Sequence, residues 1–283
     1  MRPDPALNFE TERPRLLRLA YRMLGSHAEA EDMVQEAFLR WQHAEAVEVP
    51  AAWLTRVVSR LCLDQMKSAR ARRETYPGTW LPEPLIEEVD DALREDNLTL
   101  SLMMALERLS PLERAAFLLH DVFGQPLSEV ATTLDRSASA TRQLASRARA
   151  HVRIDRPRYE VPRDTGHSIA RAFFHACRSG DASALNKMLA EDAMLYSDGG
   201  GRVSSYPNVI EGATNLVRLF QGLQRKFGAQ MQFLGARVID GLPGFISRND
   251  GNLQITALAI EDGRIKALYI TRNPEKLTGL LPH

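Results

Sequence analysis

The stretch LSEVATTLDRSASATRQLASRARAHVR (127–153) has the pattern of a helix-turn-helix. A short segment with apolar residues at helical spacing, 127–134, leads into a turn at 135–137, and a longer basic segment follows. Many proteins use two helices joined in this way to place the second helix in the DNA major groove. The pattern therefore predicts a DNA-binding domain in the middle of the chain.

The basic segment has two opposite faces when it is drawn as a helix. One face is apolar and predicted to be buried: Ala140, Thr141, Leu144, Ala145, Ala148 and Val152. The opposite face is polar and basic, and we expect its residues to contact DNA: Ser139, Arg142, Ser146, Arg149 and Arg153. An apolar stripe docks such a helix, while its arginines can reach guanine edges and phosphates.

Composition places the chain among ordinary globular proteins, with 283 residues, 44% hydrophobic and 25% charged. This length suits two or three domains. No apolar run approaches the roughly 20 residues of a membrane helix, and the N-terminus lacks the apolar centre of a signal peptide. Cys62 and Cys177 are too far apart to suggest a disulfide framework or a metal cluster. We expect a cytoplasmic protein with no membrane partner, metal or cofactor.

The net charge is zero, but the charges are segregated. Basic residues dominate 56–73, acidic residues dominate 83–96, and the second basic block covers 136–158. This layout suggests two anionic contacts separated by a linker that avoids them.

Periodicity divides the chain into helical and strand-rich parts. Residues 8–75 and 98–154 are expected to be helical, as are 167–193 and 209–228 further on. The last third alternates with period two, and Asn249-Asp250-Gly251 and Asp262-Gly263 are predicted hairpin turns. The expected fold is two all-α domains followed by an α+β domain with an antiparallel sheet. Its boundaries are a helical domain 1–75, a linker 76–97, a helix-turn-helix domain 98–156, a linker 157–164 and an α+β domain 165–283.

Two surfaces of the first domain need partners. In the helix around EDMVQEAFLRW, one face combines acidic and amide groups with a leucine: Asp32, Gln35, Glu36 and Leu39. A leucine ringed by such groups suits a protein interface. In the helix that Pro50 opens, a second basic face is expected to point outward: Arg56, Ser59, Arg60, Leu63, Lys67 and Arg70. A basic groove beside aromatic and polar groups suits single-stranded DNA.

The order of four stretches resembles extracytoplasmic-function (ECF) sigma factors of RNA polymerase. AYRMLGSHAEAEDMVQEAFLRW and WLTRVVSRLCLDQMKSARARRE are similar to sigma region 2, and LSPLERAAFLLHDVFGQPLSEVA and TRQLASRARAHVR to region 4. Three short motifs, WLPEP (80–84), DGGGR (198–202) and NPEKL (273–277), resemble the SigJ-type subgroup, which carries a fused SnoaL-like (ketosteroid-isomerase-like) cone. Arg202 departs from the lysine that usually follows the glycines, and arginine is no exact substitute for lysine.

The resemblance implies a non-enzymatic subunit that binds core RNA polymerase, at the β′ clamp helices and the β flap, and promoter DNA. It assigns Asp32, Gln35 and Glu36 to the clamp-helix contact, with Leu39 on the same face. It assigns the −10 element to Arg56, Arg60, Lys67 and Arg70, and the −35 element to the helix from Ser137. It further implies regulation in cis by the C-terminal domain. The expected regulatory contacts are Trp80, Leu81, Pro82, Asp198, Gly199, Gly200, Arg202, Asn273, Pro274 and Lys276, with Glu83, Glu87 and Glu88 as possible partners of Arg202.

Two other readings compete with a sigma factor. The C-terminal cone could be a small-molecule enzyme or sensor that uses His175, Tyr196 and Asp198 as acid or base groups. Each of these residues also has an ordinary structural explanation: a surface histidine, strand packing and a turn. The chain could also be a one-component helix-turn-helix regulator, although this leaves the faces of the first domain unexplained.

Overall fold

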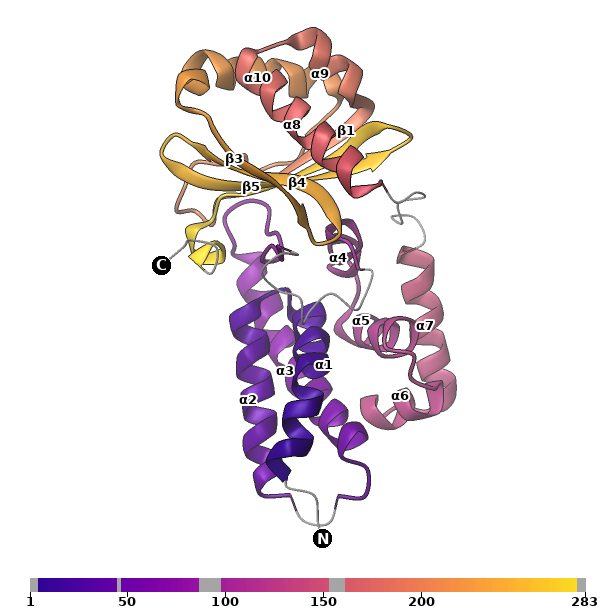
Figure 1. Cartoon of the computed structure of the whole chain (residues 1–283). Coiled ribbons are helices and arrows are strands. Elements are labelled where there is room, and N and C mark those ends of the chain that lie inside the picture. The colour runs from indigo at the N-terminus through magenta and orange to yellow at the C-terminus, as the bar shows by residue number, and fades with distance from the viewer. Residues whose placement is uncertain (1–4, 45–46, 87–97, 153–160, 279–283) are drawn as a thin grey trace. The chain divides into compact units, whose positions relative to one another are not determined.

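The computed structural model describes residues 5–44, 47–86, 98–152 and 161–278, which fall into two compact units. The first unit holds the helices of residues 5–74 and 102–152 (Figure 1). The second unit joins residues 161–278 to two pieces of the preceding chain, 75–86 and 98–101. No helix in the described ranges is long and apolar enough to cross a membrane.

Three helices form the first part of unit one, namely α1 (Pro5–Leu24), α2 (His27–Gln42) and α3 (Pro50–Glu74). The chain breaks after α1: Gly25 adopts φ 70° and the Ser26 side chain accepts a hydrogen bond from the Glu29 amide. The buried side of α2 consists of Ala30, Val34, Ala37 and Trp41. The helices therefore pack through apolar stripes and leave their polar faces outside.

The helix-turn-helix prediction is confirmed. From residue 102 onward, the second part of unit one contains the rest of α4 (Leu100–Leu106), then α5 (Pro111–Phe117), the π-helix η2 (Leu118–Val122), α6 (Leu127–Leu134) and α7 (Ala138–Val152). A capping box between Ser110 and Glu113 starts α5. Asp135, in the left-handed conformation at φ 54°, ends α6 and turns the chain into α7. Aspartate suits this position because it tolerates the left-handed conformation better than most residues.

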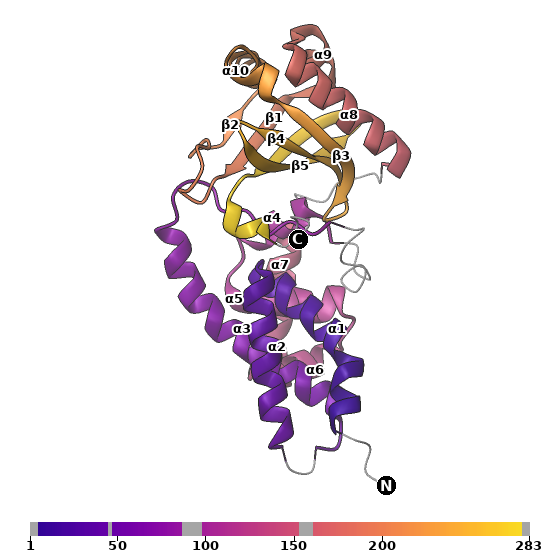
Figure 2. The same ribbon diagram turned by 60° about the vertical axis from the view of Figure 1, so that its left-hand side comes forward.

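Unit two is an α+β domain built on a six-stranded sheet of order β2-β1-β6-β5-β4-β3. Its helices, α8, α9 and α10, cover one face of the sheet (Figure 2). Only β1 and β6 run parallel; the other neighbours are antiparallel. The elements are α8 (Arg163–Ser179), α9 (Ala182–Met188), β1 (Leu189–Asp198), β2 (Ile210–Glu211), α10 (Ala213–Phe227), η3 (Gly228–Gln230), β3 (Gln232–Ile239), β4 (Leu242–Asn249), β5 (Asn252–Glu261), β6 (Arg264–Thr271) and η4 (Pro274–Lys276).

The prediction of one helix over 167–193 is wrong. Gly180 adopts φ 72° and ends α8, and the Asp181 side chain accepts a 3.0 Å hydrogen bond from the Ala184 amide to start α9. Residues 189–193 belong to β1. Glycine after a helix and aspartate at the next N-cap are the usual signals for such a break.

Asp-Gly pairs make the hairpins of the sheet. Asp240, Asp250 and Asp262 have φ of 43°, 53° and 50°, and the glycine after each also has a positive φ. Two consecutive residues with positive φ form the turn that matches the twist of paired strands. The two predicted hairpins are confirmed, and Asp240-Gly241 makes a third one between β3 and β4.

Phenylalanines fill the space between the helices and the sheet. Phe174 of α8 lies 5.2 Å from Phe233 and 5.5 Å from Phe245, measured between ring centroids. Phe173 lies edge-on to Phe220 of α10 at 5.4 Å. Such tilted and edge-to-face contacts add to the free energy gained by burying the rings. The only two cysteines of the chain, Cys62 in α3 and Cys177 in α8, are buried free thiols.

We predict that Phe174→Ala lowers the free energy of unfolding of unit two by about 3–5 kcal/mol, because a cavity replaces a ring at the centre of the aromatic cluster. The neighbouring His175 is exposed, so His175→Ala should change little. Hydrogen exchange of the β3–β6 amides in increasing denaturant measures the effect. Equal exchange in both variants would contradict this account of the core.

Candidate functional sites

The basic face of α7 is exposed as predicted. Ser139, Arg142 and Ser146 are exposed, whereas the opposite stripe, which includes Thr141, Ala145, Ala148 and Val152, is buried. Arg149 is half-buried, and its Nε lies 2.7 Å from Oδ1 of Asp121. Arg153 lies outside the described residues. Three polar side chains and one anchored guanidinium thus follow one outer face.

On α2, the predicted interface residues lie together on one accessible face. Asp32 and Gln35 are exposed, and Leu39 is an exposed large apolar side chain at 45%. Glu36 is half-buried, and its carboxylate accepts a 2.8 Å hydrogen bond from Arg40. The face combines negative charge with one apolar contact, which suits a basic protein surface.

The basic face of α3 is only partly as predicted. Arg60 and Lys67 are exposed, and Lys67 pairs with Asp64 at 2.7 Å. Arg56 is half-buried, and the prediction that Ser59 points outward is wrong because it is fully buried. The helix contacts α5 and α6 as well as α1 and α2, so more than one of its sides is covered. The side chain of Arg70 lies outside the described residues.

The second unit contains a buried carboxylate that binds four donors. Asp198, at the end of β1, is 0% exposed. Its Oδ1 accepts hydrogen bonds from the Tyr76 hydroxyl at 2.6 Å and the Gly200 amide at 3.0 Å. Its Oδ2 accepts from the Leu81 amide at 2.9 Å and from Lys276 Nζ at 2.8 Å. Asp198 is therefore both the predicted turn former and the point where the linker joins the sheet.

Lys276 closes this cluster from the C-terminal side. Its Nζ also donates to the Leu81 carbonyl, and it lies 4.2 Å from the Trp80 ring centroid. The side chain is only 8% exposed. The Tyr76 hydroxyl accepts a 3.0 Å hydrogen bond from Asn273 Nδ2. Burial, together with the neighbouring Asp198 carboxylate, raises the pKa of Tyr76 well above its ordinary value, so the phenol remains a neutral donor.

The three short motifs thus meet at one cluster, which we call the linker clamp (Tyr76, Trp80, Leu81, Asp198, Asn273 and Lys276). A tryptophan in a proline-rich linker is expected to be exposed, but Trp80 is half-buried, and Leu81 and Pro82 are buried. Gly199 and Gly200 allow close approach, since a Cβ on Gly200 would lie 2.4 Å from Asn273. Pro274 begins η4, which carries Lys276.

Arg202 pairs with an acidic residue that was not among the expected partners. Its Nη2 lies 3.0 Å from Glu275 of the NPEKL motif. Glu87 and Glu88 lie outside the described residues. Both side chains of the pair are about two-thirds exposed, so this ion pair contributes little to stability.

Sequence reasoning missed a second attachment of the linker, at Asp240. This 3% exposed residue accepts the Leu85 amide at Oδ2 (3.0 Å) and donates its own amide to the Leu85 carbonyl (2.9 Å). Ile86 forms a bridge with Ile239, and the Leu100 amide donates to the Asp240 carbonyl at 2.9 Å. An Asp-Gly pair signals a turn, and nothing in the sequence distinguishes a turn that also binds a distant segment. Tyr76 was missed for a similar reason, because it lies outside the three motifs.

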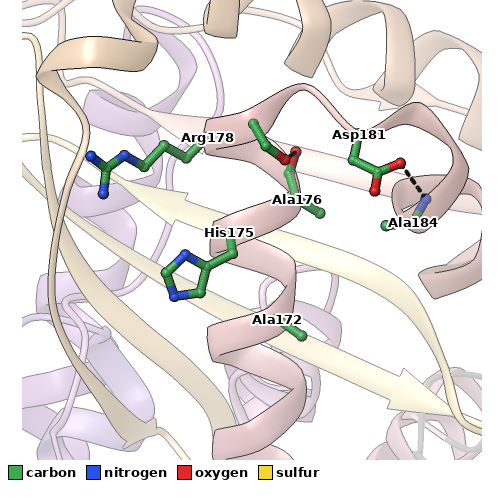
Figure 3. Close-up of a pocket in the computed structure, with 7 residues that line it drawn as sticks. Ala172, His175, Ala176, Arg178, Asp181 and Ala184 are labelled. Carbon is green, nitrogen blue, oxygen red and sulfur yellow. Dashed lines mark hydrogen bonds between the residues drawn. The ribbon is translucent and has the colours of Figure 1, made fainter.

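The three candidate acid or base groups are not brought together. Tyr196 stacks on Tyr269 with ring centroids 5.3 Å apart, and Asp198 is paired with Lys276. His175 is exposed on α8, beside a hollow of about 500 Å³. Figure 3 shows His175 and Arg178 projecting from α8, and Asp181 beyond the end of that helix, where it caps α9. This geometry gives no arrangement for proton transfer among them.

Two parts of the chain match known protein families. Residues 9–72 match the family Sigma-70 region 2, and residues 99–152 match Sigma-70, region 4. The chain is 38% identical to the ECF RNA polymerase sigma factor SigJ of Mycobacterium tuberculosis (strain H37Rv), over 96% of this chain and 92% of that protein. It is 34% identical to the probable ECF RNA polymerase sigma factor SigI of M. tuberculosis (strain CDC 1551), over 96% and 94% respectively.

A solved structure extends the similarity to the whole fold. The crystal structure of M. tuberculosis extracytoplasmic function sigma factor SigJ superimposes with a TM-score of 0.79 at 35% identity, over 97% of this chain and 98% of that one. The expected fold class, two all-α sigma domains followed by an α+β cone, is therefore confirmed. The chain belongs to the extracytoplasmic-function sigma factors of RNA polymerase.

Proposed function

We propose that this sigma factor binds core polymerase through α2, opens and reads the −10 element with α3, and reads the −35 element with α7. We further propose that its C-terminal domain controls these activities in cis through the linker clamp. Promoter recognition and transcription initiation are the work of the family to which the chain belongs. The cytoplasm, where polymerase and chromosome are, is the proposed location.

The α2 assignment is supported by accessibility and charge. Asp32, Gln35 and Leu39 are exposed on one face, and the helix keeps its apolar stripe buried behind them. Substitutions on this face should therefore change binding without changing the fold. The clamp-helix contact of polymerase is the proposed partner.

The DNA assignments are supported by the two basic helices. The −35 assignment rests on Ser139, Arg142, Ser146 and Arg149 of α7, and Arg153 completes that face in the sequence. The −10 assignment rests on Arg60 and Lys67 of α3, with Arg56 half-covered and Arg70 next along the helix. Two tethered contacts of modest strength would add to each other, because binding of one raises the local concentration of the other.

The single observation that carries the regulatory proposal is the buried pair of Asp198 and Lys276, with side chains 0% and 8% exposed. A charge buried in this way is costly to leave unpaired. The linker supplies the Tyr76 hydroxyl and both backbone groups of Leu81 to this pair. Releasing the linker would therefore leave several charged and polar groups without these hydrogen-bond partners. The segment that connects the two sigma regions is thereby held on the C-terminal domain.

We predict that reversing charge on α2, with Asp32→Lys and Glu36→Lys together, weakens binding to core polymerase about ten-fold or more, because like charges would then face the basic partner surface. Glu10→Lys with Glu48→Lys makes the same charge change at two other exposed positions and should not weaken binding. Titration of labelled protein with core polymerase gives the dissociation constants. Equal binding by both double variants would contradict the assignment of α2 to the polymerase contact.

We predict that Asp198→Asn releases the linker, because Lys276 loses its buried counter-ion at a cost of about 3–5 kcal/mol. The Leu81 amide, which donates to Asp198, should then exchange with solvent many times faster in hydrogen-exchange measurements, whereas the Leu85 amide is held separately by Asp240. Glu275→Gln removes one negative charge from an exposed pair nearby and should leave both amides protected. Unchanged protection in Asp198→Asn would show that the pair does not hold the linker.

We predict opposite effects of two truncations on run-off transcription with core polymerase. A chain ending at Arg272 loses Asn273 and Lys276, which should free the linker while keeping the sheet, and transcription should rise. A chain ending at Arg163 loses the whole scaffold, and transcription should fall. Equal transcription from both truncated chains and the full-length chain would argue against regulation in cis.

A further inference from the structure

A wide helical turn places an acidic residue beside the recognition helix. In η2 the Phe123 amide donates to the Leu118 carbonyl at 2.9 Å, five residues back, where an α-helix would bond four residues back. Leu118 and Leu119 are fully buried. The extra residue in the turn changes which side chains face the core. Asp121 consequently lies against α7, and π-turns of this kind are frequent at functional sites.

Asp121 holds one edge of the Arg149 guanidinium. Its Oδ1 lies 2.7 Å from Arg149 Nε, and the Asp121 side chain is 19% exposed while that of Arg149 is 42% exposed. Among the described residues, Arg149 is hydrogen-bonded through Nε, and its side chain is 42% exposed, so the edge formed by Nη1 and Nη2 is the part that remains for other contacts. Arginine uses this planar edge for bidentate contacts with phosphate or guanine. Arg149 is therefore anchored at one edge and open at the other.

The anchor has two effects on DNA binding that act in opposite directions. A free arginine loses side-chain rotamer freedom when it is fixed, and a side chain already held loses less. The Asp121 carboxylate also offsets the charge of Arg149, so attraction to phosphates of any sequence is reduced. The first effect favours DNA on which the guanidinium is correctly placed, and the second disfavours all other DNA.

We propose that Asp121 is a positioning residue for promoter selectivity: it orients Arg149 on the outer face of α7 and suppresses sequence-independent binding. This inference rests on the proposed function of α7 in reading the −35 element. It goes beyond that function because Asp121 belongs to η2, which precedes the two helices of the helix-turn-helix.

The test measures a ratio of affinities with holoenzyme reconstituted from core polymerase and the full-length chain. One probe is a duplex that the wild-type holoenzyme selects from a random-sequence pool, and the other is a shuffled duplex of the same composition. The ratio of the two affinities should fall about five-fold in Asp121→Asn. Binding to the shuffled duplex should become tighter, with a salt slope steeper by up to about one ion. Both probes see the same preparation, so a partly unfolded fraction cancels.

Four variants make the outcome specific. Arg149→Ala should lower the ratio similarly, and Asp121→Asn should have no further effect in that background. Asp121→Glu, which keeps the charge, should retain most of the selectivity. Glu129→Gln removes an equal charge from an exposed site on α6 and should change both affinities alike, leaving the ratio constant. Arg142→Ala tests the underlying function of α7 independently.

Three results would overturn the proposal. If Asp121→Asn keeps the wild-type ratio while Arg142→Ala lowers it, α7 reads DNA but Asp121 does not position Arg149. If Glu129→Gln lowers the ratio as much as Asp121→Asn does, the effect is one of net charge alone. If neither Asp121→Asn nor Arg142→Ala changes the ratio, the assigned role of α7 fails, and the inference fails with it.

Discussion

A buried carboxylate with four donors is the constraint on which the arrangement of the second unit depends. Asp198 cannot be left without partners at 0% exposure, and those partners come from three separate parts of the chain: the linker, the glycine turn and the C-terminal motif. The cost of an unpaired buried charge greatly exceeds the net gain from one neutral hydrogen bond. The three motifs are therefore interdependent, and a change in one of them alters the free energy of the other two contacts.

The helical domains could be read from the sequence because their signals are local. The capping box at Ser110, the turn at Asp135 and the apolar stripe of α7 each depend on residues a few positions apart. The error at Ser59 has the opposite origin. Helical periodicity gives one buried face, and it cannot reveal that α3 is contacted by α5 and α6 as well.

The linker clamp was only partly predictable for the same reason. The sequence drew attention to Trp80, Asp198 and Lys276 by family resemblance, but it did not pair them. Contacts over 78 and 122 residues, such as those of Asp198 with Lys276 and Tyr76, leave no periodic signal in one chain. The exposure of Trp80 could not be predicted either. A tryptophan in a proline-rich linker is expected to be exposed, and the sequence does not reveal that Lys276 lies over its ring. Asp240 is the clearest example: its sequence context predicts an ordinary hairpin turn and gives no sign that its carboxylate also binds the Leu85 amide.

The two buried thiols restrict how this protein can respond to oxidants. Burial raises the pKa of Cys62 and of Cys177 well above the ordinary range for a thiol, and Glu29 adds to the rise at Cys62. Only the thiolate reacts readily with peroxides or disulfides. The raised pKa values disfavour that form in both residues, and each side chain is buried within a folded unit. Oxidants therefore reach either sulfur readily only where the surrounding fold opens, so the two buried cysteines are poorly placed to act as early redox sensors.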